Sequence, residues 1–435
     1  MQRLFSLCAI SYLMIYAFEG VIRYGLYNIG ASDAILLRDG LILGPLVLLL
    51  VAQVARTRVH PAFFAFGAIV GLHGLVSTLN FHNVFPAMYG AVLLLNVLFG
   101  FIAARSLVLP NRRVVLLLGT VWVISVVAVV LDKFFVTFPW TGLETHIGGI
   151  SVDVSRGWDI SDGFDKRAAG FTRSSICAAM LLPTIALIIA LRIRSYLLRT
   201  LMLFMTVAAV FMTTQKGAVV AIAAVAMILA TPRFMRYRLL CWAALGFAIL
   251  DVALPIFTYG LMVTSNGGVF SMASFGMRIA DTWPDAWRWI SDHNLFPFGV
   301  GLGGIGGAQR WFAPDFFNPS DNLFVYLYAN FGVLTFFYLG WALWQAWHQP
   351  PETQSIAITP LAILVFMLGY GAALSMLEDQ VSELFFGASV GMLWMLRQMA
   401  AAKPWANPYW VPPDLRYGPA ITYKPVRSLP AADVP

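Results

Sequence analysis

The sequence predicts an all-α membrane protein, a polytopic bundle of about twelve transmembrane helices. Hydrophobic residues make up 60% of its 435 residues and charged residues only 11%, which leaves too little polar surface for a soluble globule of this length. Apolar runs of roughly 17 to 25 residues, the length that a helix needs to cross the hydrocarbon core of a bilayer, recur along the chain. The alternating pattern of a membrane β-barrel is not found.

The expected spans are apolar runs that end at charged or turn-forming residues. They cover residues 4–22, 36–55, 61–79, 84–104, 113–135, 171–191, 197–213, 217–231, 238–262, 321–346, 356–376 and 383–399. Two of them, 197–213 and 217–231, are short and are joined only by Thr214-Gln215-Lys216. We expect this pair to be a tight helical hairpin, formed either by two short spans or by one broken span.

The distribution of charge predicts which side of the membrane each loop faces, because Lys and Arg near span ends are retained in the cytoplasm. If the chain starts inside and crosses at every span, one side collects the clusters Arg56/Arg58, Arg105/Arg112/Arg113, Arg192/Arg194/Arg199, Arg233/Arg236/Arg238 and Arg397/Lys403. Both termini are then cytoplasmic, and the large loops 136–170 and 264–319 are external. The net charge of +7 follows from this topology, so no nucleic-acid partner is expected.

The chain is expected to hold one membrane domain, residues 1–399, and a Pro-rich cytoplasmic tail, residues 400–435, that is disordered. The first span resembles a signal peptide, but Glu19 and Arg23 stand where a cleavage site would be needed, so we expect it to be uncleaved. The three cysteines have no metal-ligand spacing and no obvious pairing. Neither a metal nor a cofactor is expected, and no nucleotide-binding glycine loop or hydrolase motif is present.

Basic residues at the external ends of two spans predict an anion site. Arg167 and Arg173 flank the start of the span at 171–191, and Lys216 opens the span at 217–231. The N-terminus of a helix favours an anion, and guanidinium groups bind phosphate oxygens through paired hydrogen bonds. Such residues also snorkel to lipid headgroups, but their external position opposes the usual bias and favours a bound diphosphate.

The external loop 264–319 is expected to carry a helix that lies on the membrane, over residues 278–287. Its aromatic residues Trp283, Trp287 and Trp289 are placed at interfacial depth or line a sugar site. The glycine run that follows breaks the helix and permits close approach of the backbone to a ligand. Arg288 and Arg310, in the same loop, are expected to be solvated charges.

An ordered set of motifs then resembles a known family. The set is Arg-x-x-Gly at Arg167 to Gly170, Thr213-Thr214-Gln215-Lys216-Gly217, Arg278 followed by Trp283, Pro297 to Gly303, and Asp321-Asn322 followed by Asn330-Phe331-Gly332-Val333-Leu334. It is similar to the bacterial O-antigen ligase and polysaccharide polymerase family over roughly residues 160 to 345.

The resemblance implies an inner-membrane glycosyltransferase that uses glycans carried on undecaprenyl diphosphate at the periplasmic face. It also implies inversion at the anomeric centre and no metal ion. By the same resemblance, Arg167 and Arg278 hold the diphosphate, with Lys216 and Arg173 as further binding residues. Where the family usually has Ser-Arg between the short spans, this chain has Gln215-Lys216, which keeps the charge and loses the paired hydrogen bonds.

The largest departure from the family is Asp321-Asn322, which replaces a His-Asn pair that binds the acceptor or takes its proton. Asp321 could accept a proton, although a usual pKa near about 4 makes it a weak base. Alternatively it is an acidic residue stabilised by the dipole in the first turn of a helix. His293 is a possible substitute for the base, and we expect Asn322 and Trp283 to contact substrate.

Polymerisation of lipid-linked repeat units, in exopolysaccharide or O-antigen biosynthesis, is the preferred function. Transfer of the glycan to lipid A core by a ligase is the first alternative. A transporter or flippase of lipid-linked sugars would place ionisable residues near the middle of the membrane, where the sequence offers mainly Asp251. The expected partners are an undecaprenyl-diphosphate-linked glycan, a glycan acceptor, membrane lipid and other polysaccharide export or assembly proteins, for which the chain could also be a scaffold.

Overall fold

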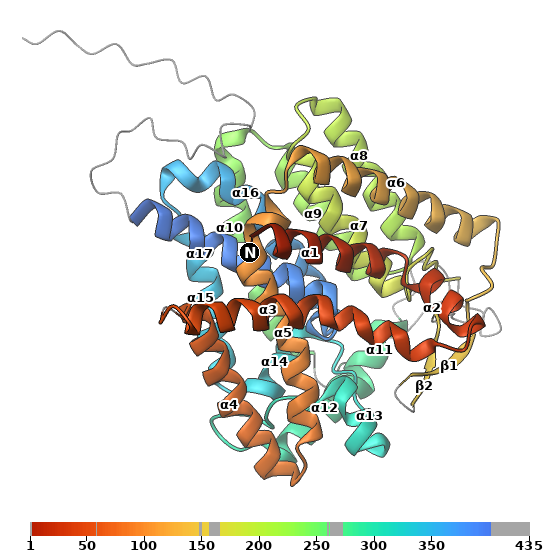
Figure 1. Cartoon of the computed structure of the whole chain (residues 1–435), viewed down its shortest axis with the longest axis vertical. Helices are drawn as coiled ribbons and strands as arrows, with labels where there is room; N and C mark the ends of the chain where they lie inside the picture. Colours follow the sequence, from red (N-terminus) through yellow and green to blue (C-terminus); the bar gives the residue numbers. More distant parts are fainter. Residues whose placement is uncertain are drawn as a thin grey trace, which may run out of the picture.

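The computed structural model describes residues 2–57, 59–147, 150–155, 166–258, 261 and 273–401, and it is almost entirely helical (Figure 1). Most of the predicted tail at 400–435 lies outside the described residues, as do Arg58 and Lys403. Parts of the predicted loops 136–170 and 264–319 also lie outside them.

Among the residues that the structure describes, seven helical segments are long and apolar enough to cross a membrane. They are η1 with α3 (Ser32–Asp39 and Gly40–Val54), α4 (Pro61–Phe81), α5 (Phe85–Val108), α6 (Arg112–Phe134), α10 (Arg233–Phe257), α16 (Pro351–Gly371) and α17 (Gln380–Ala401). They are typical of a multi-pass membrane protein with an all-α bundle, which confirms the predicted class.

The expected twelve full spans are not all present as such. Helices α1 (Gln2–Ala17) and α2 (Glu19–Asn28) meet at 75°, and together they could add an eighth span. Helices α7 (Ser175–Ala190), α8 (Tyr196–Met212) and α9 (Lys216–Ala230) have 16, 17 and 15 residues. At 1.5 Å per residue they are about 22 to 26 Å long, against about 30 Å for the hydrocarbon core.

The expected span at 321–346 is broken into α14 (Leu323–Phe331) and α15 (Leu334–Trp347). Gly332 separates them with a φ of 57°, in the region that glycine enters without strain. The next amide, Val333 N, donates to the carbonyl oxygen of Pro297 at 2.9 Å. A loop distant in sequence therefore supplies the hydrogen-bond partner at the break.

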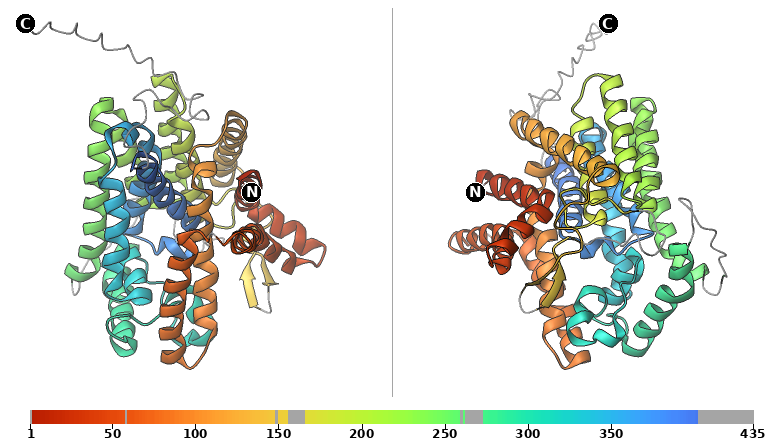
Figure 2. Two further views of the ribbon diagram at one scale, coloured as in Figure 1. Left: turned by 60° about the vertical axis from the view of Figure 1, so that its left-hand side comes forward. Right: turned by 90° about the vertical axis from the view of Figure 1, so that its right-hand side faces the viewer.

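The remaining elements are short and cover one end of the bundle. They are the antiparallel hairpin β1 (Glu144–Ile147) and β2 (Ile150–Asp153), α11 (Ala273–Met277), the π-helix η3 (Arg278–Thr282), α12 (Trp283–His293), η4 (Gly306–Ala308), α13 (Gln309–Phe312), η5 (Pro314–Phe316) and η6 (Met376–Glu378). Figure 2 shows α12 and α13 beside the turn that joins α4 and α5. At this turn Asn80 Nδ2 donates to His293 O at 2.6 Å, and the rings of Phe81 and Phe312 are 4.6 Å apart.

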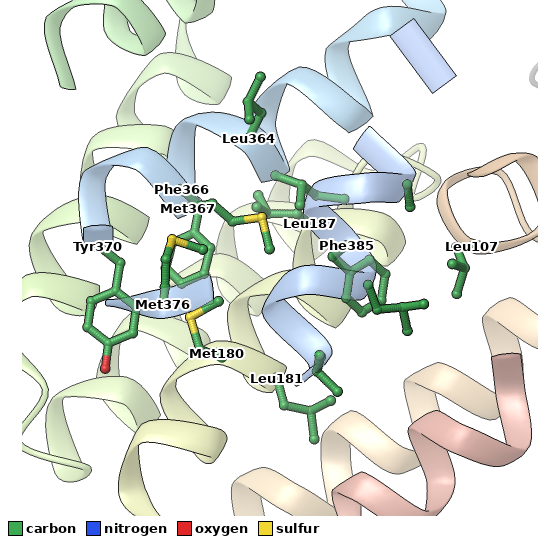
Figure 3. Close-up of a cluster of buried hydrophobic side chains, with 14 of the residues drawn as sticks. Leu107, Met180, Leu181, Leu187, Leu364, Phe366, Met367, Tyr370, Met376 and Phe385 are labelled. Carbon is green, nitrogen blue, oxygen red and sulfur yellow. The ribbon is translucent and has the colours of Figure 1, made fainter. Parts of the chain in front are cut away.

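The centre of the bundle is formed by α7, α16 and α17, whose apolar side chains are buried along most of their length. Figure 3 shows Met180 and Leu181 from α7 in one cluster with Phe366 and Met367 from α16 and Phe385 from α17. Loops at the ends of these three helices carry many of the polar residues of the candidate site. The packed core therefore fixes the positions of those loops.

Glycines allow α5 and α17 to pack with their backbones in contact. A Cβ added to Gly100 would lie 1.9 Å from the carbonyl oxygen of Leu384, and one added to Gly387 would lie 2.0 Å from that of Val97. Small residues at helix crossings are typical of membrane bundles, where close backbone approach maximises dispersion contacts.

Gly100→Ala is therefore expected to force the two helices apart and to lower stability by about 1–3 kcal/mol. Gly119→Ala, in α6, is the matched control, because no atom lies within 4 Å of the added Cβ. That variant gains helix propensity and should melt at or above the wild-type temperature. Melting temperatures in detergent check both, and equal values for the two variants would contradict this packing.

The glycine run at 297–306 approaches neighbouring helices. A Cβ added to Gly301 would lie 2.4 Å from Ser77 N, and one added to Gly303 would lie 1.9 Å from Pro86 O. Gly303 N also donates to Asn330 Oδ1 at 2.7 Å. The close backbone approach that the sequence predicted is thus made, among the described residues, to α4, α5 and α14.

Candidate functional site

Five loop segments meet at one end of the bundle and bring most of the predicted site residues near one another. They are 166–174, 213–216, η3, 317–322 and 372–379. Ser175 Oγ accepts from Gln215 Nε2 at 3.2 Å, and Gln215 Oε1 accepts from the Tyr370 hydroxyl at 3.1 Å. The charges of Arg278 and Asp321 act on the same tyrosine. Tyr370, at the end of α16, is therefore the side chain around which these segments gather.

Arg278 and Asp321, predicted from two separate motifs, form an ion pair. Arg278 Nε lies 3.1 Å from Asp321 Oδ2, and the two side chains are 19% and 24% exposed. Arg278 opens the π-helix η3, a wide turn that is frequently found at functional sites. The contact is made through Nε of the guanidinium group.

Asp321 is held by a strained backbone and does not occupy the first turn of a helix as expected. Ser320 and Asp321 have φ values of 57° and 42°, in the left-handed region that costs energy for residues other than glycine. Helix α14 begins two residues later, at Leu323, with Asn322 as its N-cap. The dipole of that helix therefore acts on Asn322, while the partner of Asp321 is Arg278.

Asn322 is fully buried and serves the fold. Its Oδ1 accepts from Val325 N at 3.0 Å, and its Nδ2 donates to Asp251 O at 3.1 Å and to Ala372 O at 3.4 Å. The predicted substrate contact is replaced by hydrogen bonds that join α14 to α10 and α16. Asn322 therefore acts as a positioning residue for its neighbour Asp321.

Arg167 lies on a loop that is fixed to the end of α6. Asp132 Oδ2 accepts hydrogen bonds from Ala169 N at 2.8 Å and from Gly170 N at 2.9 Å, and Lys166 Nζ lies 2.9 Å from its Oδ1. Gly170 has a φ of 59° and packs on α6, where a Cβ would lie 3.1 Å from Val129 N. The glycine of the Arg-x-x-Gly motif is thus needed for close packing on α6. The fixed loop holds the backbone of Arg167 in place.

Lys216 is the exposed first residue of α9, and the charge of Arg167 acts on it. The turn before it is fixed by Gln215, which contacts both Ser175 and Tyr370. Two cations from different segments are therefore close enough for the charge of one to act on the other.

Arg173 is placed in a second, buried group of charges. The carboxylate of Glu19 is the strongest charge acting on it, and the charge of Asp379 also acts on it. Glu19, which is 1% exposed, lies 2.7 Å from Arg23 Nη2 and 3.1 Å from Arg38 Nη1. Glu19 thus has three arginines around it, and the charge of Asp379 adds to its attraction for Arg173.

His293 and Trp283 are distant from this arrangement or enclosed by protein. His293 ends the continuous helical segment that contains Arg278, fifteen residues and about 22 Å further along. Its ring stacks on Trp289, with centroids 3.9 Å apart, and its Nδ1 lies 3.0 Å from Trp289 O. The Trp283 side chain is 1% exposed, so it packs in the protein and not at the membrane surface. The helix presents its aromatic side to the bundle.

Glu378 is the residue that the sequence did not single out. It ends η6 in the loop between α16 and α17, where Oε1 accepts from Gly307 N at 2.6 Å and Oε2 lies 2.8 Å from Ser375 Oγ. Ser375 Oγ also lies 2.9 Å from Pro319 O, and its single proton cannot serve both oxygens. When Glu378 is ionised, the proton of Ser375 Oγ is donated to Oε2.

The environment of Glu378 suits a group that exchanges protons near neutral pH. Burial raises the pKa of its carboxyl from 4.5 to about 7, although the hydrogen bonds from Gly307 and Ser375 oppose the rise. The charge of Asp321 raises this pKa further, and that of Arg310 lowers it. The signal in the sequence was slight, an acidic pair between two apolar runs.

Within the described part of the chain, no group of three or more His, Cys, Asp or Glu side chains is arranged to hold a metal ion. No protein-family model matches the chain, and no curated protein matches it either.

Proposed function

We propose that the protein is an inner-membrane polysaccharide polymerase that joins undecaprenyl-diphosphate-linked repeat units at the periplasmic face by inverting, metal-independent glycosyl transfer. The observation that carries the proposal is that cations from separate segments converge at this end of the bundle. The charge of Arg167 acts on Lys216, and that of Arg278 acts on Tyr370, which Gln215 beside Lys216 contacts. Three cations from three loops at one end of an apolar bundle suit a diphosphate attached to a membrane lipid.

In the proposed reaction a sugar hydroxyl of the acceptor attacks the anomeric carbon of the donor. The bond from that carbon to the diphosphate oxygen breaks, and its electron pair leaves with the lipid diphosphate. Arg167, Lys216 and Arg278 stabilise the negative charge that develops there. The proton of the attacking hydroxyl passes to Glu378, whose pKa is better matched to the task than that of an ordinary carboxylate.

In this scheme Asp321 positions Arg278 and does not take the proton, because its carboxylate is already occupied by the guanidinium group. This revises the role expected from the sequence. The residues from Gly306 to Phe317 precede Asp321 in the chain and contact Glu378 through Gly307 N, so they are suited to contact the acceptor.

The direct test is incubation of the purified protein in liposomes with undecaprenyl-diphosphate-linked repeat units and a chelator, followed by gel analysis. A ladder of products is expected, with no ladder from empty liposomes. Single repeats that persist beside glycan transferred to lipid A core would instead show a ligase. A requirement for added metal would contradict the metal-independent scheme.

The rate is expected to rise as pH increases through about 7, because Glu378 must be ionised to accept a proton. Stability is expected to change in the opposite sense. Glu378 binds more protons in the folded protein than in the unfolded chain between pH 4.5 and about 7, so unfolding becomes easier across that window as pH rises.

Glu378→Gln is expected to slow transfer by about 10²-fold and to remove both pH effects. Asp285→Asn, at an exposed carboxylate in α12, is the matched control and should keep the wild-type profiles. The rate against pH and the melting temperature against pH are the two measurements. A wild-type rate profile in the Gln variant would exclude Glu378 as the base.

A flippase of lipid-linked sugars is a second candidate, favoured by one observation. Asp251 lies within α10 and is 2% exposed, and neither of its carboxylate oxygens has a hydrogen-bond partner among the described residues. Ionisable residues inside membrane helices are typical of transport pathways. Movement of a labelled lipid-linked sugar across liposomes without chain growth, lost in Asp251→Asn, would favour this function over polymerisation.

A further inference from the structure

An apolar groove lies between α8 and α9, toward the end of the bundle away from the candidate site. Its volume is about 280 Å³, and its lining includes Leu203, Phe204, Val207, Ala226 and Met227. It extends to Ala230, the last residue of α9, whereas Lys216 is the first. On α9 the lining begins at Ala223, which is seven residues and about 10 Å beyond Lys216, so the groove lies apart from the candidate site.

Basic residues gather where the groove ends. Arg199 lines the groove, with its guanidinium group 5.3 Å from the centre of the Tyr196 ring. Its charge and that of Arg233 both act unfavourably on Arg236, which is 7% exposed and donates through Nε to Thr231 O at 2.9 Å. Among the described residues, no carboxylate charge acts on Arg236.

Arg199 and Arg233 both act on Arg236, so an anion bound at this position would relieve their repulsion. Arg236 is buried, which limits how far it can move away from the other two. Helices α8 and α9 are also shorter than the hydrocarbon core, and a bilayer thins beside short helices, which brings lipid headgroups to their ends.

We propose that this groove binds one anionic phospholipid, with an acyl chain along α8 and α9 and the phosphate on Arg199, Arg233 and Arg236. The apolar lining is continuous with Arg199, whose charge acts on Arg236, and this selects a phospholipid over free phosphate, which would leave the groove unfilled. Cationic pockets between membrane helices bind anionic lipid headgroups by the same combination of contacts.

The test compares phosphatidylglycerol with phosphatidylcholine of the same acyl chains, added to delipidated protein in neutral detergent and counted by native mass spectrometry. Wild-type protein is expected to retain phosphatidylglycerol at least about tenfold more strongly. The double variant Arg199→Ala, Arg236→Ala should lose this preference. Arg56→Ala, an exposed arginine at the end of α3, is the matched control and should keep it.

A second variant tests the groove itself. Ala226→Trp fills it without changing charge, and it should lower retention of phosphatidylglycerol while all arginines remain. Melting temperatures near that of the wild type show that each variant is folded. Equal retention of the two lipids by wild-type protein, or an unchanged preference in the double variant, would mean ordinary boundary lipid and overturn the proposal. None of these measurements depends on glycosyl transfer.

Discussion

Replacing Arg167 and Arg278 together by alanine is expected to leave no detectable polymer while the protein still inserts and folds. In the proposed reaction each cation stabilises the departing lipid diphosphate, and loss of one such group typically costs about 10²–10³ in rate. Because both residues act on the same diphosphate, their effects should not add in full, and the double variant is expected to lose about 10³-fold or more. Gel analysis of repeat-unit ladders measures the loss.

Two further variants sharpen this experiment. Arg288→Ala, in the same helical segment as Arg278, is the matched control, because its side chain is 72% exposed and pairs only with Asp285 of its own helix among the described residues. It should polymerise normally. Arg278→Lys keeps the charge but loses the planar group of donors, so an intermediate rate is expected. Long polymer made by the double variant would refute the assigned role of both arginines.

Glu19→Ala is expected to destabilise the protein by about 3–5 kcal/mol, the largest effect on folding that a single change should have. The carboxylate is buried and lies within 3.1 Å of both Arg23 and Arg38, and its charge also acts on Arg173. Removing it leaves three cations close together in a partly desolvated place. Arg38 then keeps Asp39 as an acidic neighbour, and Arg173 keeps Asp379. Loss of one partner from a buried ion pair typically costs this much.

Thermal unfolding in detergent tests the prediction, with Glu144→Ala as the matched control. Glu144 is exposed in β1, where its carboxylate accepts from Ser151 Oγ at 3.2 Å, so its loss should leave the melting temperature nearly unchanged. Glu19→Gln should be destabilised as well, since a neutral amide cannot balance three cations. Melting of both Glu19 variants at the wild-type temperature would show that the cluster contributes little.

The helices were predictable because their signal is local. Every expected apolar run contains helix, since hydrophobicity and length are properties of a short stretch of chain. The bend between α1 and α2 depends on distant residues instead. Gly20 N donates to Phe171 O at 2.9 Å, and a Cβ on Gly20 would lie 2.9 Å from Thr172 O, so packing against a later loop redirects the first expected span.

The site was predictable in part for the same reason. Arg167, Lys216, Arg278 and Asp321 were recognised from their own motifs. The structure places Arg278 and Asp321 near Tyr370, and the charge of Arg167 acts on Lys216. Sequence alone could not pair Arg278 with Asp321, nor assign Arg173 to Glu19, because these contacts join segments far apart in the chain. Glu378 was missed because its properties come from Gly307 and Ser375, which fold around it.

The three hydrogen bonds of the Asn322 side chain have a consequence for how such a protein could diversify. They anchor the start of α14 to α10 and α16, so the geometry of the neighbouring Arg278–Asp321 pair is inherited from the bundle. The exposed residues within 307–317 do not anchor one helix to another in this way. We expect substitutions at that surface to change the sugar preference of the proposed enzyme, while the geometry of the Arg278–Asp321 pair stays the same.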